Sequence, residues 1–280
     1  MSKLKVLNSK LFFYYNFFIQ KPKYAKQIQH GKNSDFDHIK YVSGFDIKPN
    51  SQIFVHAGLK SIKMVTGDDY QDIISKLIKA LQEVYSPNSI IVPSFTPSFR
   101  KTGVYSKNYS KGEYGVFSEL PRHQADMRTD DAIHGVAIFT KDTSKFDNID
   151  YQDTFSENGL YATLKKNTYI LNISTNFFVS TYMHYIEEDL KVPYKKNGGL
   201  ESKGILLDEN NQPKKIVQNN HHYLYRTEIN REKVKRTLEK NNALNSIEYL
   251  GLKSSCIAVE DLDAILREEI SKDPYYLVTP

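Results

Sequence analysis

Hydrophobic residues recur along the chain in two kinds of spacing. Short apolar runs bounded by turn residues predict buried strands, and apolar residues three or four positions apart predict helices. Residues 70–84 have the clearest helical spacing, with Asp68 or Asp69 as the N-cap, and Pro193 ends a helix that begins at Thr181. The predicted strands are 51–56, 89–93, 133–140, 168–173 and 256–259, with a hairpin over 205–217 that turns at 208–211, a polar loop over 94–111, and helices over 70–84, 116–120, 181–190, 231–241 and 261–270.

Strands that alternate with helices predict an α/β layered domain. Residues 1–34 differ from the rest, because the run 11–19 (LFFYYNFFI) is aromatic and the residues after it are polar. This run is too short for a signal peptide core and no small-residue cleavage site follows it. We expect it to dock on the main domain, residues 35–280, or on a neighbouring subunit of a homodimer. Adhesion to a membrane surface is the alternative.

Composition and charge narrow the class of protein. Of the 280 residues, 40% are hydrophobic and 25% are charged, which excludes global disorder. The single cysteine, Cys256, excludes an internal disulfide framework and a cysteine-rich zinc site. No apolar run reaches the roughly 18 residues of a membrane span. We therefore expect a cytoplasmic protein with no membrane span.

The net charge of +5 is mild. No block of five or more Lys and Arg residues occurs, so we expect no nucleic-acid partner, and the densest basic stretch, 233–240, is typical of a solvated helix face. A basic chain suits small anionic ligands such as phosphates. The charge therefore favours an anionic small-molecule substrate over a polycation.

Two clusters of residues carry candidate chemistry. Thr181, His184 and Glu187 are spaced three residues apart, so each adjacent pair shares a helix face. A carboxylate beside an imidazole fixes its tautomer and raises its basicity, as a general base requires, although a surface His–Glu contact has the same spacing. The second cluster, residues 128–134, joins Arg, Asp and His at the mouth of a predicted strand, where a salt-bridged turn is the alternative.

Other candidates are weaker. The glycine-rich dinucleotide and P-loop motifs, the serine-hydrolase elbow and the zincin motif are all absent. His221 and His222 have no third ligand at useful spacing, so we expect a loop there and no metal site. His56 ends the first strand, where a core histidine and a ligand-binding one are equally expected. Cys256 is expected to be a buried apolar side chain.

Several segments, taken in order, match one pattern. They are 55–62 (V-H-S-S-L-S-S-[IL]), 65–68 (V-x-G-G), 92–96 (M-P-[ST]-F-T), 105–119 (S-x-x-x-M-G-x-x-S-E), 128–129 (R-[ST]), 181–187 (T-x-x-H-x-x-E) and 192–194 (V-P-Y). Together they resemble the aminoglycoside 3-N-acetyltransferase-like family, which includes bacterial nucleotide-sugar N-acyltransferases. The resemblance covers about residues 50–195, with a weaker tail to about 270.

This resemblance implies a single α/β/α layered domain with a central mixed sheet that binds coenzyme A. It implies acyl transfer from the thioester to a primary amine in a ternary complex, with no covalent enzyme intermediate. His184 would be the base, Glu187 would support it, Thr181 would lie near the thioester, and Asp131 would line the acceptor site. Coenzyme A would contact His56, Ala57, Gly58, Leu59, Lys60, Ser61 and Thr96, and the acceptor would contact Tyr105, Tyr114, Glu119, Arg128 and His134.

The acceptor is predicted from charge and from one motif. Residues 128–134 are similar to the R-T-x-D-P-x-H of the sugar-acylating branch, although Ala132 and Gly135 depart from it, as Ala57 and Gly58 depart from the family's serines. Aminoglycosides are polycations and suit acidic sites, whereas this chain is basic. We therefore expect an acetyl or 3-hydroxybutyryl group to be transferred to a dTDP-type nucleotide-linked amino-deoxy sugar, for O-antigen or other surface polysaccharide. Aminoglycoside 3-N-acetylation and a non-catalytic binding relative are the alternatives.

Overall fold

A mixed sheet of seven strands forms the centre of the computed structural model, which describes residues 3–20, 36–175 and 177–280. Its three middle strands run parallel, and the strands toward both edges are added antiparallel. The middle strands are continuous hydrophobic runs, as expected where both faces of a sheet are covered. The strand order is β4 (Met127–Arg128), β5 (Val136–Thr140), β2 (Ser89–Pro93), β1 (Gln52–Ala57), β6 (Thr168–Ile173), β10 (Leu252–Ala258) and β9 (Asn245–Tyr249).

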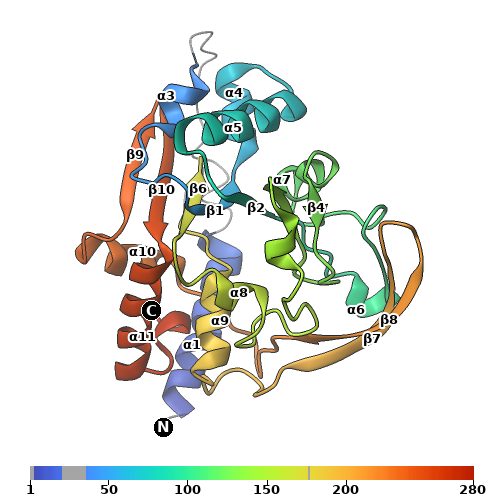
Figure 1. Cartoon of the computed structure of the whole chain (residues 1–280). Helices are drawn as coiled ribbons and strands as arrows, with labels where there is room; N and C mark the ends of the chain where they lie inside the picture. Colours follow the sequence, from blue (N-terminus) through green and yellow to red (C-terminus); the bar gives the residue numbers. More distant parts are fainter. Residues whose placement is uncertain (1–2, 21–35, 176) are drawn as a thin grey trace.

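Helices cover both faces of this sheet (Figure 1). Ile53 and Val55 of β1 pack into the core under α3, α4 and α5, whereas Phe54 between them packs into the core of the opposite face, with α8 to α11. This alternation follows from the two-residue period of a strand. The predicted α/β/α layering and mixed sheet are confirmed. The covering helices are α3 (His38–Val42), α4 (Leu59–Thr66), α5 (Tyr70–Tyr85), α8 (Leu160–Thr163), α9 (Tyr182–Asp189), α10 (Arg231–Lys240) and α11 (Val259–Lys272).

The predicted helices form for the local reasons that the sequence indicated. Asp69 caps α5, because its carboxylate accepts the backbone N–H of Asp72. Helix α9 ends before Pro193, as predicted. The shorter helical segments are α6 (Phe99–Thr102), α7 (Val116–Glu119), η2 (Leu120–His123), η3 (Thr143–Phe146) and η4 (Tyr276–Val278).

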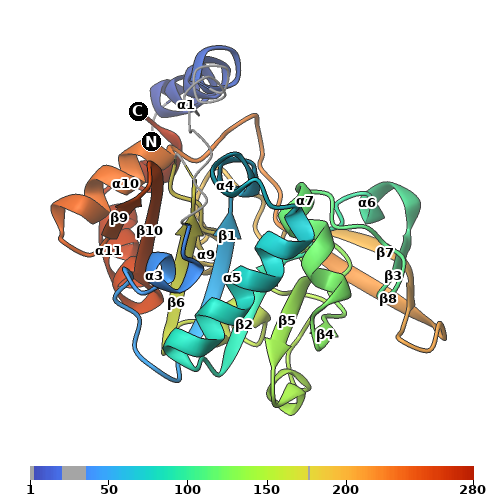
Figure 2. The same cartoon turned by 90° about the horizontal axis from the view of Figure 1, so that it is seen from above.

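A second, smaller sheet extends to one side of the main sheet (Figure 2). It contains β3 (Val104–Ser106), β7 (Leu200–Leu207) and β8 (Pro213–Asn220) in that order. The predicted turn at 208–211 is correct, but the hairpin strands extend well beyond 205–217. Polar residues alternate along this half-exposed hairpin, so its ends carry too few apolar residues to mark them. The predicted loop over 94–111 is wrong in part, because α6 and β3 lie within it.

Three other predicted boundaries were wrong. The strand predicted over 133–140 begins at Val136, because residues 131–134 form a turn. Helix α4 and the polar edge strand β9 were not predicted, and the strand predicted at 256–259 is the end of β10. Edge strands such as β9 lack the apolar run that marks a buried strand.

The N-terminal segment begins with α1 (Lys3–Tyr15), which continues into the π-helical turn η1 (Asn16–Gln20). Val6 packs against the core on the α11 side of the sheet. The predicted N-terminal segment, residues 1–34, lies partly outside the described residues, because residues 1–2 and 21–35 are not described. Among the described helices, none is long and apolar enough to cross a membrane.

Candidate active site

The main cavity, of about 660 Å³, opens where the parallel strands β1, β2 and β6 end. The carboxyl ends of parallel strands are the usual place for a ligand in an α/β fold. Residues 56–61, 174–184 and 221–231 form much of its wall, so segments distant in the sequence meet there. The lining side chains used below are His56, Lys60, Ser61, Phe95, Tyr114, His134, Thr181, His184, His221, Tyr223 and Arg231.

His184 on α9 is held by the carboxylate one helical turn after it. Its Nδ1 lies 2.8 Å from Oε2 of Glu187. A carboxylate accepts only, so Nδ1 carries the proton and Nε2 carries the lone pair. Because His184 lines the cavity and Nδ1 is occupied, Nε2 is the nitrogen available to a bound ligand.

Glu187 is fully buried behind this histidine and has several partners. The hydroxyl of Tyr194 donates to Oε1 at 2.8 Å, and that of Tyr223 donates to Oε2 at 3.4 Å. The ammonium of Lys195, itself buried, lies 2.9 Å from Oε2. Burial opposes the charge of Glu187, but Lys195 and His184 hold the pKa of its carboxyl at about 2. The carboxylate is therefore ionised at neutral pH.

The four histidines of the cavity wall are neutral at neutral pH. Burial lowers the pKa of His184, and Lys195 lowers it further, while Glu187 acts in the opposite direction. Burial likewise lowers the pKa of His56 to about 3 and places that of His134 and His221 well below the usual range. A neutral imidazole can accept a proton, so the electrostatics of the site suit a general base at position 184.

Three of these histidines lie side by side. The ring centroid of His221 is 4.3 Å from that of His184 and 5.1 Å from that of His134, with the rings nearly parallel in both pairs. Nδ1 of His134 and Nδ1 of His221 have no hydrogen-bond partner among the described residues. The rings are stacked instead of converging on a point. In the described part of the chain, no group of three or more His, Cys, Asp or Glu side chains is placed to hold a metal ion.

The wall beside β1 is the first turn of α4. Gly58 precedes this helix, and its N–H donates to the carbonyl of Ile173 at 2.8 Å, so this N–H is not free to bind a ligand. The N–H groups of Leu59, Lys60 and Ser61 follow in the first turn, where the helix has no carbonyl to accept them. A Cβ on Gly58 would lie 2.3 Å from the carbonyl oxygen of Ser174, which explains why a serine cannot occupy this position.

The structure brings many of the predicted site residues to the cavity. The predicted residues that line it are His56, Ala57, Gly58, Lys60, Ser61, Tyr114, His134, Thr181 and His184. Glu187 contacts the cavity only through His184. Leu59 lies in the core under α4, because its helical position turns it to the sheet. Five other predicted contacts, Thr96, Tyr105, Glu119, Arg128 and Asp131, lie away from the cavity and brace the loops behind it.

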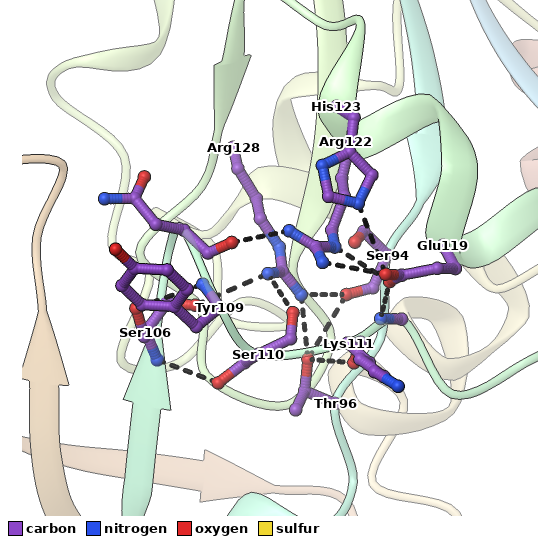
Figure 3. A network of polar contacts seen from close by, with 12 residues as sticks. Ser94, Thr96, Ser106, Tyr109, Ser110, Lys111, Glu119, Arg122, His123 and Arg128 are labelled. Atoms are coloured by element: carbon purple, nitrogen blue, oxygen red, sulfur yellow. Dashed lines mark hydrogen bonds and ion pairs between the residues drawn. The ribbon is translucent and has the colours of Figure 1, made fainter.

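Arg128 is the centre of this bracing network (Figure 3). Its guanidinium is buried and donates to the carbonyls of Ser94 and Ser110 and to the hydroxyl of Thr96. Next to it, Glu119 accepts two hydrogen bonds from Arg122 and one from a backbone N–H. The prediction that these residues contact the acceptor is corrected, since their polar atoms are used within the protein.

Asp131 and Tyr105 are also structural. One oxygen of Asp131 accepts the N–H groups of Ile133 and His134 at 2.8 and 2.7 Å, which forms the turn that carries His134 into the cavity. Burial raises the pKa of Asp131 to about 7. The hydroxyl of Tyr105 donates to the carbonyl of Thr129 inside the core. The predicted contact of Asp131 with the acceptor is therefore replaced by a role in positioning His134.

Sequence reasoning missed four residues of the site. His221 follows β8 in the predicted loop, and Tyr223 lies two residues after it. Lys195 directly follows the V-P-Y motif and Arg231 begins α10, so neither lies in a matched segment. The pair of histidines at 221 and 222 was a signal, but nothing in the sequence indicates that this loop returns to α9.

A smaller cavity of about 270 Å³ lies on the other side of His221. Four carboxylates line it, together with one lysine and a set of asparagines. Burial raises the pKa of Glu188 there, and the nearby carboxylates act in the same direction. The acidic side chains are Asp153, Glu157, Glu188 and Asp189.

Comparison with known proteins identifies this arrangement. A family model for aminoglycoside 3-N-acetyltransferase matches residues 54–270. The chain belongs to the aminoglycoside 3-N-acetyltransferase family. The predicted family, and with it an N-acyltransferase enzyme that uses coenzyme A, is confirmed at this level. A comparison with curated protein sequences found no match.

Solved structures of the aminoglycoside 3-N-acetyltransferase family share the fold at low identity. YokD from Bacillus subtilis has a TM-score of 0.68 and 16% identity, over 89% of this chain and 96% of its own. AAC-IIIb in a binary complex with CoASH has a TM-score of 0.65 and 13% identity, over 84% and 95%. AAC-VIa bound to sisomicin has a TM-score of 0.65 and 13% identity, over 84% and 96%.

Proposed function

We propose that this protein transfers an acyl group from acyl-CoA to the amine of a nucleotide-linked amino-deoxy sugar, for surface polysaccharide such as O-antigen. The observation that carries the acyl-transfer step is the pair His184–Glu187, joined at 2.8 Å in the wall of the main cavity. Family membership supports the thioester donor and the amine acceptor. The acyl chain would be acetyl or of the 3-hydroxybutyryl type.

In this proposal His184 moves the proton. Nε2 of His184 takes a proton from the acceptor amine as its nitrogen attacks the thioester carbonyl carbon. The C–N bond forms, the C–S bond breaks, and His184 then returns the proton to the departing thiolate of coenzyme A. Glu187 stabilises the imidazolium that forms in between, as a carboxylate partner does in other acid–base pairs. Lys60 and Ser61, with the first-turn N–H groups of α4, would hold coenzyme A.

Two features of the main cavity support a nucleotide-linked acceptor. Lys60 and Arg231 line it against the single carboxylate of Glu228, so its charged side chains favour an anionic ligand. Tyr114 is 69% exposed and meets Phe95 edge to face at a centroid distance of 5.7 Å. An exposed ring at a cavity wall offers a stacking surface to a nucleobase.

One observation favours the second candidate, an aminoglycoside. The smaller cavity beside His221 carries four carboxylates against one lysine, which suits a polycation. AAC-VIa, a solved relative, binds sisomicin. The two candidates differ in the charge of the acceptor, so each predicts a different set of contacts for the same transfer reaction.

The test is release of free thiol from acetyl-CoA and 3-hydroxybutyryl-CoA. The acceptor panel contains nucleotide-linked 3-amino and 4-amino sugars and two aminoglycosides. Thiol release with a nucleotide-linked sugar is the expected result. Release with aminoglycosides alone would replace the proposed acceptor with the second candidate. Coenzyme A binding without release from any pair would contradict both and support the non-catalytic relative.

A variant separates the two acceptors. Asp153→Asn removes a carboxylate from the smaller cavity and leaves the main cavity unchanged. A polycationic acceptor would show a KM raised about tenfold by this change, because each lost ion pair weakens binding by roughly 1 kcal/mol. The KM of a nucleotide-linked sugar is expected to stay within about twofold. Lys145→Gln, on the exposed segment η3, is the matched surface-charge control.

A further inference from the structure

Helix α1 and the turn η1 present two apolar faces. Val6 packs toward the core and Ser9 is fully buried, so one face rests on the protein. The other face is exposed, and its side chains follow a spacing of three and four residues. We call this exposed face the N-terminal patch; it consists of Leu4, Leu7, Leu11, Tyr14 and Phe18, which are between 45% and 66% exposed.

Contacts with the main domain fix which face of the helix is exposed. Nζ of Lys5 forms an ion pair with Asp273 at 2.5 Å, next to the C-terminal end of α11. The ammonium of Lys10 lies 5.7 Å from the ring centroid of Tyr225. Figure 2 shows α1 at the edge of the molecule, beside the C-terminus. The N-terminal patch therefore points away from the protein while the helix stays attached.

Positive charge surrounds the N-terminal patch. Phe12 of α1 shares a shallow groove with Lys233, Arg236 and Lys240 of α10, so the basic face of α10 lies beside the patch. The first 34 residues contain seven lysines and no Asp or Glu. Exposed leucine and aromatic side chains with flanking lysines are the features of helices that lie in the interface of an anionic membrane.

We propose that the N-terminal patch binds the surface of an anionic membrane. The helix would lie in the plane of the bilayer, with the patch among the acyl chains and the cations of α1 and α10 at the lipid headgroups. The 18 residues of α1 and η1 are enough for an interfacial helix, and the aromatic residues Tyr14 and Phe18 suit the interfacial region.

A second copy of the chain fits the N-terminal patch less well. In a two-fold dimer the same surface meets itself. Lys3 and Lys10 of both copies, together with Arg236 and Lys240, would then be brought together, and α1 offers no carboxylate to pair with them. Like charges across an interface disfavour association, whereas anionic headgroups neutralise the same lysines.

Co-sedimentation of the full chain with vesicles tests this proposal. Vesicles of phosphatidylglycerol with phosphatidylcholine are compared with vesicles of phosphatidylcholine alone, at low and high salt. We expect binding to the anionic vesicles, weakened by salt because screening reduces the attraction of the lysines. The double variant Leu7→Gln with Leu11→Gln should bind about tenfold more weakly, since two apolar side chains no longer enter the bilayer.

Matched variants separate the apolar and the charged contributions. Ile39→Gln changes an equally exposed aliphatic residue on α3, at the opposite end of the molecule in Figure 1, and should leave binding within about twofold. Arg236→Gln with Lys240→Gln should weaken binding to anionic vesicles and reduce its salt dependence. Thermal unfolding of each variant confirms that these surface changes preserve the fold.

Three results would overturn the proposal. Absence of binding to anionic vesicles would do so, as would equal binding to phosphatidylcholine vesicles, because the lysines would then contribute nothing. A wild-type dimer that becomes monomeric in Leu7→Gln with Leu11→Gln, without vesicle binding, would assign the patch to a second copy. None of these outcomes depends on acyl transfer, so the proposed function stands or fails separately.

Discussion

The ammonium of Lys195 lies 2.9 Å from Oε2 of Glu187, the same carboxylate oxygen that holds the Nδ1–H of His184. Both side chains are almost completely buried, so their attraction is weakly screened. Lys195 thus supplies the counter-charge that keeps Glu187 ionised, and its positive charge also lowers the pKa of His184. This buried ion pair places a positioning residue behind the proposed base.

Lys195→Met should change the pH dependence of the reaction. Without the ammonium, the pKa of His184 rises, so the imidazole is protonated at higher pH and the acid limb of kcat/KM moves to higher pH. Loss of one partner of a buried pair should also lower the free energy of unfolding by about 3 kcal/mol. The measurements are a pH–rate profile and thermal unfolding.

Two variants serve as controls for Lys195. Lys195→Arg keeps the positive charge and should restore the wild-type acid limb. Lys196→Met removes the exposed neighbouring lysine and should leave the pH profile unchanged. An acid limb that Lys195→Met leaves in place would show that Lys195 does not act on His184.

Gly58 should not tolerate the serine that the family has at this position. A Cβ there would lie 2.3 Å from the carbonyl oxygen of Ser174, so Gly58→Ser should cost about 1–3 kcal/mol of unfolding free energy. Ala57→Ser, one residue earlier and at the cavity wall, should be nearly neutral. Chemical denaturation of both variants checks this, and equal stability of the two would contradict the close approach of the chains.

Much of this fold could be predicted from hydrophobic pattern alone. The buried strands β1, β2 and β6 and the helix α5 have strong apolar periodicity, and each lies where it was expected. Helix α4 was missed because its eight residues follow a strand directly and carry no polar N-cap. The edge strand β9 has alternating polar residues and lacks the apolar run of a central strand.

The site could be predicted only where a local motif carries it. His184 and Glu187 are one helical turn apart, so their contact follows from their spacing. Lys195 and His221 reach the same place through the return of the chain after α9 and after β8, which no local pattern encodes. Conversely, Arg128 and Asp131 have the residue types of a binding site but are buried in the loops behind it.

Arg128→Met should destabilise the protein instead of weakening acceptor binding. Its guanidinium satisfies buried carbonyls of Ser94 and Ser110, and their loss should cost about 3 kcal/mol. At a temperature where the variant stays folded, KM for the acceptor should be close to the wild-type value. A raised KM with unchanged stability would return Arg128 to the acceptor site.

Asp131→Asn should make stability less dependent on pH. The pKa of Asp131 is about 7 in the folded protein and its ordinary value is 3.8, so the folded state holds the proton more tightly and loses stability as pH rises from about 4 to about 7. The asparagine still accepts the two N–H groups of the turn and has no charge to bury. The variant should therefore gain stability over wild type by at least about 1 kcal/mol at pH 8 and little at pH 5. A pH-independent difference would contradict this prediction.

The central claim is that His184 is the base of an acyl transfer from coenzyme A. The most direct measurement compares turnover and coenzyme A affinity for His184→Gln, with His222→Gln as the exposed-histidine control. The account predicts that His184→Gln loses about 10²–10⁴-fold in kcat while the Kd for coenzyme A stays within about threefold of wild type, and that His222→Gln behaves as wild type. Turnover of His184→Gln at the wild-type rate would contradict it.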